Sequence, residues 1–234
     1  MNKYNTTLHQ HGQINNITKI EKQIQNNSLQ FSTVSPINDY KNDPRMSLTS
    51  VHLLNRILVQ TICKTLINPL KIIEPFHYYY SGDSFHMTIK NIKVVNNPPR
   101  FSSTEVKTVQ NIYQQVIPKH KKFKVFFYRL MLFPNNLSLI GTTDPELDNI
   151  VLDLNSHLIK VGVPDDKQYV NSQYFFSNIT LVRFTSKINQ QFIQKVNELS
   201  KNINFKPYEV DSVSLLSCNA VLEKQNIYHT WRLQ

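Results

Sequence analysis

The stretch FHMTIKNI at residues 85–92 alternates apolar and polar side chains. Successive side chains of a β-strand point to opposite faces, so this period of two predicts a strand. We expect His86 and Thr88 to share one face of the strand, while Met87 and Ile89 point into the core from the other. The stretch therefore predicts a histidine and a hydroxyl side by side on a rigid element, outside the apolar core.

A second stretch, FSNITLVRF at residues 176–184, repeats this arrangement. Asn178 and Thr180 share one face, and Ile179 and Leu181 fill the core beneath them. Each polar pair precedes a helical pattern, so the two stretches occupy matching places along the chain.

The elements around the two stretches follow one order twice: helix, extended segment, helix, two strands. In the first half we predict a helix from Thr49–Ser50 to Asn68–Pro69, extended runs at 70–80 and 85–95, a helix that begins with a capping box at Ser102, and strands at 123–133 and 137–140. In the second half we predict a helix from Asp144–Pro145, an extended run at 174–185, a helix over 188–199, and strands at 210–222 and 227–233. This order predicts an α+β fold with two pseudo-symmetric lobes of antiparallel sheet plus helices around a central cleft, lobe one at about 46–141 and lobe two at about 142–234.

Residues 1–45 are rich in Asn, Gln, Ser and Thr, and their few apolar residues do not sustain a helical face for long. A weak amphipathic helix over 17–24 is one alternative, but the composition favours a mobile polar tail.

Composition excludes several classes of protein. The chain has 234 residues with 26 Lys and Arg against 16 Asp and Glu, a net charge of +10, and it is 40% hydrophobic, which suits a folded domain with an affinity for anions. Its 4 glycines lie far apart, so no glycine-rich phosphate loop can be written. Its 2 cysteines, Cys63 and Cys218, are too few for a zinc cluster. No stretch suits a transmembrane segment or a signal peptide, so we expect a cytoplasmic protein without contact to a membrane.

At the two polar stretches the chain resembles the 2H phosphoesterase superfamily, which includes 2'-5' RNA ligase-like proteins and cyclic nucleotide phosphodiesterases. That family has two His-x-Thr/Ser motifs, each followed by an apolar residue. The run from His86 to Ile89 matches the first motif, and the run from Asn178 to Leu181 matches the second except that Asn replaces His. The resemblance covers about residues 50–234. It implies one histidine as general base, the other as general acid, and two hydroxyls on the phosphoryl oxygens, without a metal or other cofactor.

The asparagine decides between two kinds of function. Asn has no titratable proton, so half of the acid/base pair is missing at Asn178. General acid–base assistance contributes ~10²–10⁴ in rate. Three hypotheses follow: an impaired phosphodiesterase or RNA ligase-like enzyme that uses His86, Thr88 and Thr180; a non-catalytic module that binds RNA or a phosphate ligand; or an interaction protein with a vestigial cleft. In the first two, the partner is RNA or a nucleotide phosphodiester, and we expect a monomer.

Four further residues are candidates for substrate binding: Tyr80, Lys90, Arg183 and His229. Each also has an ordinary structural interpretation, since His229 is typical of a strand histidine, Arg183 of a surface charge, and Tyr80 of a half-buried strand residue. The basic run from Lys119 to Lys124 either attracts phosphates or is a solvated face.

Overall fold

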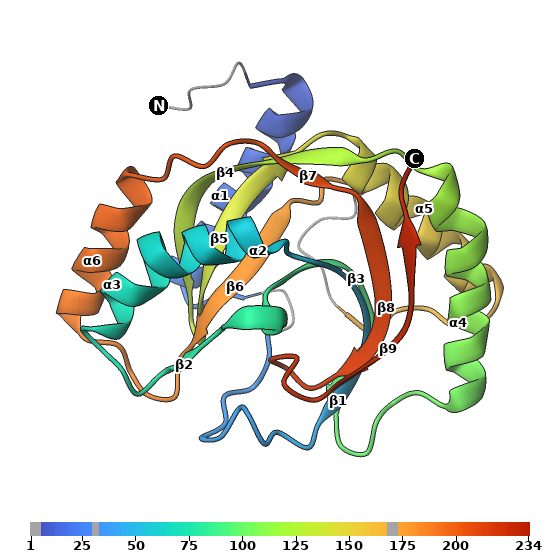
Figure 1. Cartoon of the computed structure of the whole chain (residues 1–234), viewed down its shortest axis with the longest axis horizontal. Coiled ribbons are helices and arrows are strands. Elements are labelled where there is room, and N and C mark those ends of the chain that lie inside the picture. Colours follow the sequence, from blue (N-terminus) through green and yellow to red (C-terminus); the bar gives the residue numbers. More distant parts are fainter. Residues whose placement is uncertain (1–5, 30–32, 168–172) are drawn as a thin grey trace.

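Two antiparallel sheets form the centre of the computed structural model, which describes residues 6–29, 33–167 and 173–234 (Figure 1). The first, sheet A, has the order β3-β1-β8-β9. Its strands are β1 (Met46–Leu53), β3 (His86–Asn96), β8 (Ser212–Cys218) and β9 (Gln225–Arg232). The second, sheet B, has the order β2-β6-β5-β4-β7. Its strands are β2 (Tyr78–Tyr79), β4 (Phe123–Phe133), β5 (Asn136–Thr143), β6 (Ser177–Arg183) and β7 (Tyr208–Val210). The predicted α+β class with antiparallel sheets is confirmed.

The two sheets exchange strands between the halves of the chain. The last strands, β8 and β9, join β1 and β3, whereas β4 and β5 of the first half join β6. The sheets therefore do not divide at the predicted boundary near residue 141. The predicted lobes follow the order of elements along the chain, but pairing of β1 with β8 links the two ends of the sequence.

Helices flank both sheets. They are α2 (Arg56–Ile62), α3 (Asn68–Lys71), α4 (Ser103–Val116), α5 (Glu146–Lys160) and α6 (Gln190–Lys201), with a π-helical turn η1 (Cys63–Ile67) and 3-10 turns η2 (Gly82–Ser84) and η3 (Ile117–Lys119). The capping box of α4 is confirmed, because Ser102 Oγ accepts from the Glu105 amide at 3.2 Å and Glu105 Oε2 accepts from the Ser102 amide at 2.9 Å. None of the helices in the described ranges is both long and apolar enough to cross a bilayer.

The predicted helix at Thr49 is wrong in its first part. Residues 46–53 form β1, an inner strand of sheet A, and the helix begins only after Asn55, whose Oδ1 accepts from the Leu58 amide at 2.9 Å. Neither glycine nor proline separates the two elements, so their apolar patterns merge in the sequence. Pro69 does not end the helix either, because it stands in the first turn of α3, where a missing backbone N–H is tolerated.

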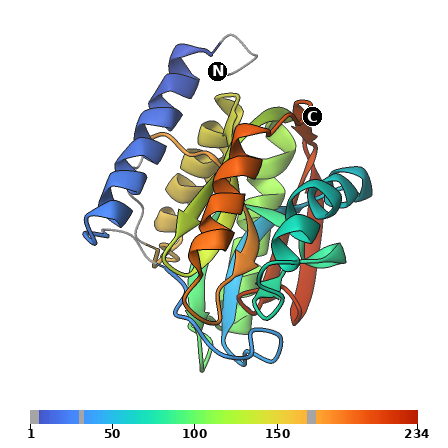
Figure 2. The ribbon, with the colours of Figure 1, turned by 90° about the vertical axis from the view of Figure 1, so that its left-hand side faces the viewer.

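The N-terminal region is not the expected mobile tail throughout. Residues Leu8–Gln25 form α1, which begins with a capping box between Thr7 and Gln10. Figure 2 shows α1 lying along one face of the molecule. Ile17 and Ile20 of α1 pack with Met131, Phe133 and Ile140 of sheet B in a cluster of their own. Most other apolar side chains, including those of α4, α5 and α6, belong to one larger core.

Candidate functional site

The first polar stretch forms β3 as predicted. Met87 and Ile89 are buried in the core, whereas His86 and Thr88 on the other face are only half-buried. β3 lies against β6, although the two strands belong to different sheets and share no ladder (Figure 1). The two stretches therefore meet where the sheets adjoin, and we name the faces that carry His86, Thr88, Asn178 and Thr180 the motif face.

On sheet B the motif face follows from the pairing of β5 with β6. Asn178 pairs with Ile140 and Thr180 with Ser138, and cross-strand partners point to the same side. Ile179 and Leu181 are fully buried on the other side. The alternation predicted for the second stretch is thus confirmed.

A β-bulge in β6 brings Arg183 onto the motif face. The register between β5 and β6 shifts after Ser138, so that Arg183 pairs with Asn136. Asn136 and Ser138 share a face, and the Ser138 hydroxyl donates to Asn136 Oδ1 at 2.9 Å. Arg183 consequently lies on the same face as Thr180, whereas strict alternation along the strand would put it on the opposite one.

A bulge in β3 has the reverse effect on Lys90. Thr88 pairs with Val51 but Lys90 pairs with Ser50, and these adjacent residues of β1 point to opposite faces. Lys90 is therefore turned away from Thr88 into the layer beneath α5, where its ammonium contacts Asp165 and donates to Asn155 Oδ1 at 3.3 Å. Its predicted place beside the motif does not hold in the structure.

Tyr80 holds Arg183 in position. The Arg183 guanidinium donates from Nε to the Tyr80 hydroxyl at 3.1 Å, and the same hydroxyl donates to the Ala220 carbonyl at 3.0 Å. The Tyr80 ring lies 6.0 Å from the ring of His86. Tyr80 is 1% exposed and offers no open ring face to a nucleobase, so its position favours orienting Arg183 over stacking.

His86 is held as a neutral imidazole. Nδ1 donates to the Ser84 carbonyl at 2.8 Å, and since a carbonyl only accepts, the lone pair of the neutral ring lies on Nε2. The pKa of His86 is lowered to about 4, mainly by burial. The hydrogen bond to Ser84 raises the pKa, and the charge of Arg183 lowers it. The ring is therefore neutral at pH 7, and Nε2 can accept a proton.

We expect NMR of ¹⁵N-labelled protein to show His86 as the Nδ1–H tautomer, with a midpoint near pH 4, assigned by loss of its signals in His86→Gln. The unfolded chain takes up this proton near pH ~6.5. His86 therefore lowers the free energy of unfolding as the pH falls from about 6.5 towards 4. A midpoint near 6.5 would contradict the buried, neutral base.

Asn178 carries a buried oxygen without a partner. Its Oδ1 is inaccessible to solvent and accepts no hydrogen bond from the residues that the structure describes. Such an unsatisfied group costs about 1–3 kcal/mol. The amide can bind, but it cannot transfer a proton.

Comparison with known proteins identifies the fold. No protein-family model and no curated protein sequence matches the chain. Among solved structures, Escherichia coli LigT in its apo form is 14% identical, with a TM-score of 0.54 over 82% of this chain and 99% of LigT. A conserved protein of unknown function from Agrobacterium tumefaciens is 12% identical, with a TM-score of 0.55 over 88% and 99% of the two chains. A further structure, described as a phosphoesterase, gives 13% identity, a TM-score of 0.53, and 81% and 99% coverage. The chain has the 2H phosphoesterase fold.

Within the 2H phosphoesterase fold, His229 lies apart from the motifs. Ser214 pairs with both Val51 and Thr230, so Thr230 is on the motif side of sheet A. His229, the next residue along β9, points to the other side, where its ring is 4.6 Å from that of Trp231. The structure therefore does not bring His229 to the site.

Lys167 is close to the motif face although no sequence pattern marks it. Burial lowers the pKa of Lys167 to about 8, and the charges of Arg183 and Lys90 act in the same direction, while Asp165 opposes them. Lys167 follows α5 in a segment without periodicity, so only the folded chain places its charge near Arg183.

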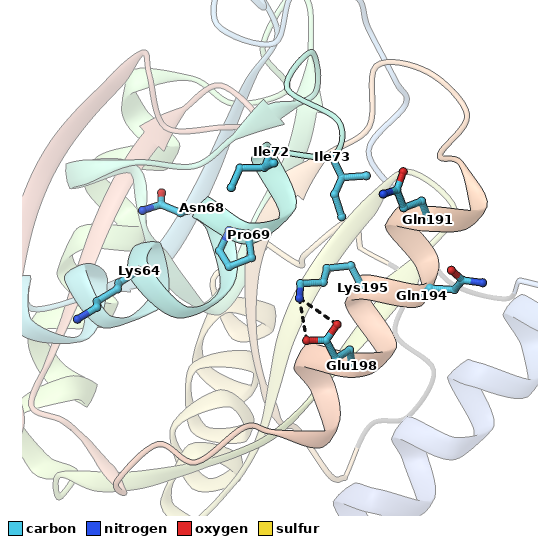
Figure 3. Close-up of a pocket in the computed structure, with 9 residues that line it drawn as sticks. All are labelled: Lys64, Asn68, Pro69, Ile72, Ile73, Gln191, Gln194, Lys195 and Glu198. Atoms are coloured by element: carbon cyan, nitrogen blue, oxygen red, sulfur yellow. Dashed lines mark hydrogen bonds and ion pairs between the residues drawn. The ribbon is translucent and has the colours of Figure 1, made fainter.

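A cavity of about 580 Å³ lies between α3 and α6 (Figure 3). Helix α6 packs on β4, with Phe192 and Val196 in the main core. It therefore covers the face of sheet B that is opposite α1 and the motifs. The cavity is lined by Lys64, Asn68, Pro69, Ile72, Ile73, Gln191, Gln194, Lys195 and Glu198. None of the predicted site residues is among them.

The described residues contain no group of three or more His, Cys, Asp or Glu side chains arranged to hold a metal ion. The groups at the motif face are an imidazole, two hydroxyls, an amide and a guanidinium. Such a set can bind a phosphate and accept a proton.

Proposed function

We propose that the chain binds the phosphate of a nucleotide phosphodiester or of an RNA end at the motif face, with turnover slow or absent because Asn178 replaces a general acid. The observation that carries the proposal is the bulge in β6, which turns Arg183 onto the face of Thr180 and toward Tyr80, whose ring lies 6.0 Å from that of His86. A guanidinium matches the geometry of phosphate oxygens, and the two hydroxyls can donate to the remaining oxygens.

The chemistry available is one half of an acid/base pair. Nε2 of His86 can take the proton of an attacking water or 2'-hydroxyl. The leaving oxygen needs a proton in turn, and neither Asn178 nor a His86 that is neutral at pH 7 supplies it. A purely non-catalytic binding module is the second candidate, and the lack of a titratable proton at Asn178 favours it.

The same proposal includes the partner, the oligomeric state and the location of the protein. We propose that it binds an RNA end or a nucleotide, is a monomer, and lies in the cytoplasm. LigT structures of the same fold contain 3'-AMP and NADP+, at 14% identity to this chain and TM-scores of 0.51 and 0.50. A net charge of +10 suits a polyanionic partner.

Titration calorimetry with 3'-AMP and with 2',3'-cyclic AMP tests the proposal. We expect wild type to bind and Arg183→Gln to bind roughly 10–100-fold more weakly, since a charged hydrogen bond contributes about 1.5–3 kcal/mol. Lys124→Gln, which removes an exposed charge outside the motif face, is the matched control and should bind as wild type does. Equal affinities of both variants would contradict a phosphate role for Arg183.

A further inference from the structure

Residues 33–45, which we name the strap, run between the ends of the two sheets before β1 begins. Asn135, in the turn between β4 and β5, donates its amide to the Val34 carbonyl. After β8, Asn219 Nδ2 donates to the Tyr40 carbonyl at 3.2 Å, and Lys224 Nζ donates to the Asn42 carbonyl at 3.0 Å. The strap is thus tied to sheet B at one end and to sheet A at the other.

Tyr40 of the strap lies on Arg183. The guanidinium carbon of Arg183 is 5.8 Å from the centre of the Tyr40 ring. The centres of the Tyr40 and Tyr78 rings are 6.1 Å apart. Tyr40 is 1% exposed and Arg183 8% exposed. Arg183 therefore has the Tyr40 ring on one side and the Tyr80 hydroxyl at Nε, which leaves little of it open to a phosphate.

Helix α1 lies on the same face of sheet B. Its Ile17 and Ile20 pack with Ile140, and Ile140 is the cross-strand partner of Asn178. The chain before β1 thus meets the motif face twice, through α1 beside Asn178 and through the strap at Arg183.

These contacts suit a segment that can lift. Of residues 6–29 and 33–45, none forms a strand of either sheet, so both ladders stay complete without them. The strap is held by side chains that donate to its backbone carbonyls, which water can replace, and by the packing of Tyr40 and Ile37 on the main core.

We propose that the strap is an intramolecular cover, and that a phosphate ligand reaches Arg183 only after Tyr40 has lifted from it. This inference rests on the proposed function and adds its regulation: binding is limited by the fraction of molecules with the strap open. Whatever stabilises the open strap then raises the apparent affinity for the ligand.

Two variants that loosen the strap outside the motif face test this, Asn135→Ala and Lys224→Ala. Lys41→Ala is the matched control, because it removes an exposed lysine of the strap whose side chain holds neither tie. Opening of the strap is measured without ligand, as the rate at which a thiol reagent labels Cys218. Cys218 is 2% exposed and directly precedes Asn219, which holds the strap. All variants carry Cys63→Ser, which removes the other free cysteine. Binding is measured by calorimetry with 3'-AMP.

In each loosened variant we expect Cys218 to be labelled roughly fivefold faster, and 3'-AMP to be bound with roughly fivefold higher affinity, than in Lys41→Ala. This is the effect of one lost hydrogen bond on a two-state equilibrium. Faster labelling with unchanged affinity would overturn the cover and leave the proposed function intact. Labelling as slow as in the control would also overturn it. If no variant binds 3'-AMP or 2',3'-cyclic AMP, the proposed function fails, and the cover of that site fails with it.

Discussion

Asn178→His is expected to raise hydrolysis of 2',3'-cyclic AMP ~10²–10⁴-fold over wild type, which is the usual contribution of a general acid or base. Position 178 lies on β6, which contacts the His86 strand β3, and we expect an imidazole there to protonate the leaving oxygen while Nε2 of His86 accepts the proton of water. The measurement is the initial rate of 2'- or 3'-AMP release at pH 7.

Two variants control this prediction. Asn178→Gln keeps the amide on a longer side chain and should gain nothing, which separates acid catalysis from a change of shape. Asn178→His combined with His86→Ala should lose the gain, because the base is then missing. A rate for Asn178→His no higher than that for Asn178→Gln would exclude position 178 as the place of a missing acid.

Lys90→Met is expected to destabilise the protein by about 3 kcal/mol and to leave the affinity for 3'-AMP unchanged. The Lys90 side chain is 1% exposed and that of its partner Asp165 is 15% exposed, so the substitution removes the ion-pair partner of a mostly buried carboxylate. Breaking a buried pair costs about 3–5 kcal/mol, and the partial exposure of Asp165 favours the lower end. Thermal unfolding should show a melting temperature roughly 6–12 °C lower.

The double variant Lys90→Met with Asp165→Leu should recover most of this stability, because it removes both charges together. Lys107→Met, on the exposed side of α4, is the matched control and should melt as wild type does. If Lys90→Met weakened binding without lowering the melting temperature, Lys90 would be a ligand residue after all.

Sequence alone predicted the parts of the fold that depend on local pattern. The capping box at Ser102, strand β4 and the two polar faces of β3 and β6 follow from periodicity and end signals, which are properties of neighbouring residues. The interpretation of residues 46–53 failed because β1 runs into α2 without a break in the apolar pattern. The N-terminal helix was predicted only as an alternative, over 17–24, because its buried face is largely polar, through Gln10, Gln13 and Asn16.

The site shows the same division. Strict alternation puts Lys90 on the face of Thr88 and Arg183 on the face away from Thr180, and both assignments are reversed in the structure. The cause in each case is a bulge, which depends on how a strand registers with its neighbour and leaves no mark in its own sequence. The proximity of Lys167 and Tyr40 to Arg183 likewise depends on contacts between distant segments.

The exchange of strands between the two sheets has a consequence for how the protein is made. β1 lies between β3 and β8, and β8 leaves the ribosome long after β1 and β3. Sheet A is therefore built from contacts of long sequence separation, which slow folding and leave strand edges exposed in the meantime. A nascent chain that stops before Ser212 contains β3 with His86 but lacks β8 and β9, so sheet A is incomplete. We expect such a chain to need protection by chaperones until β8 and β9 emerge.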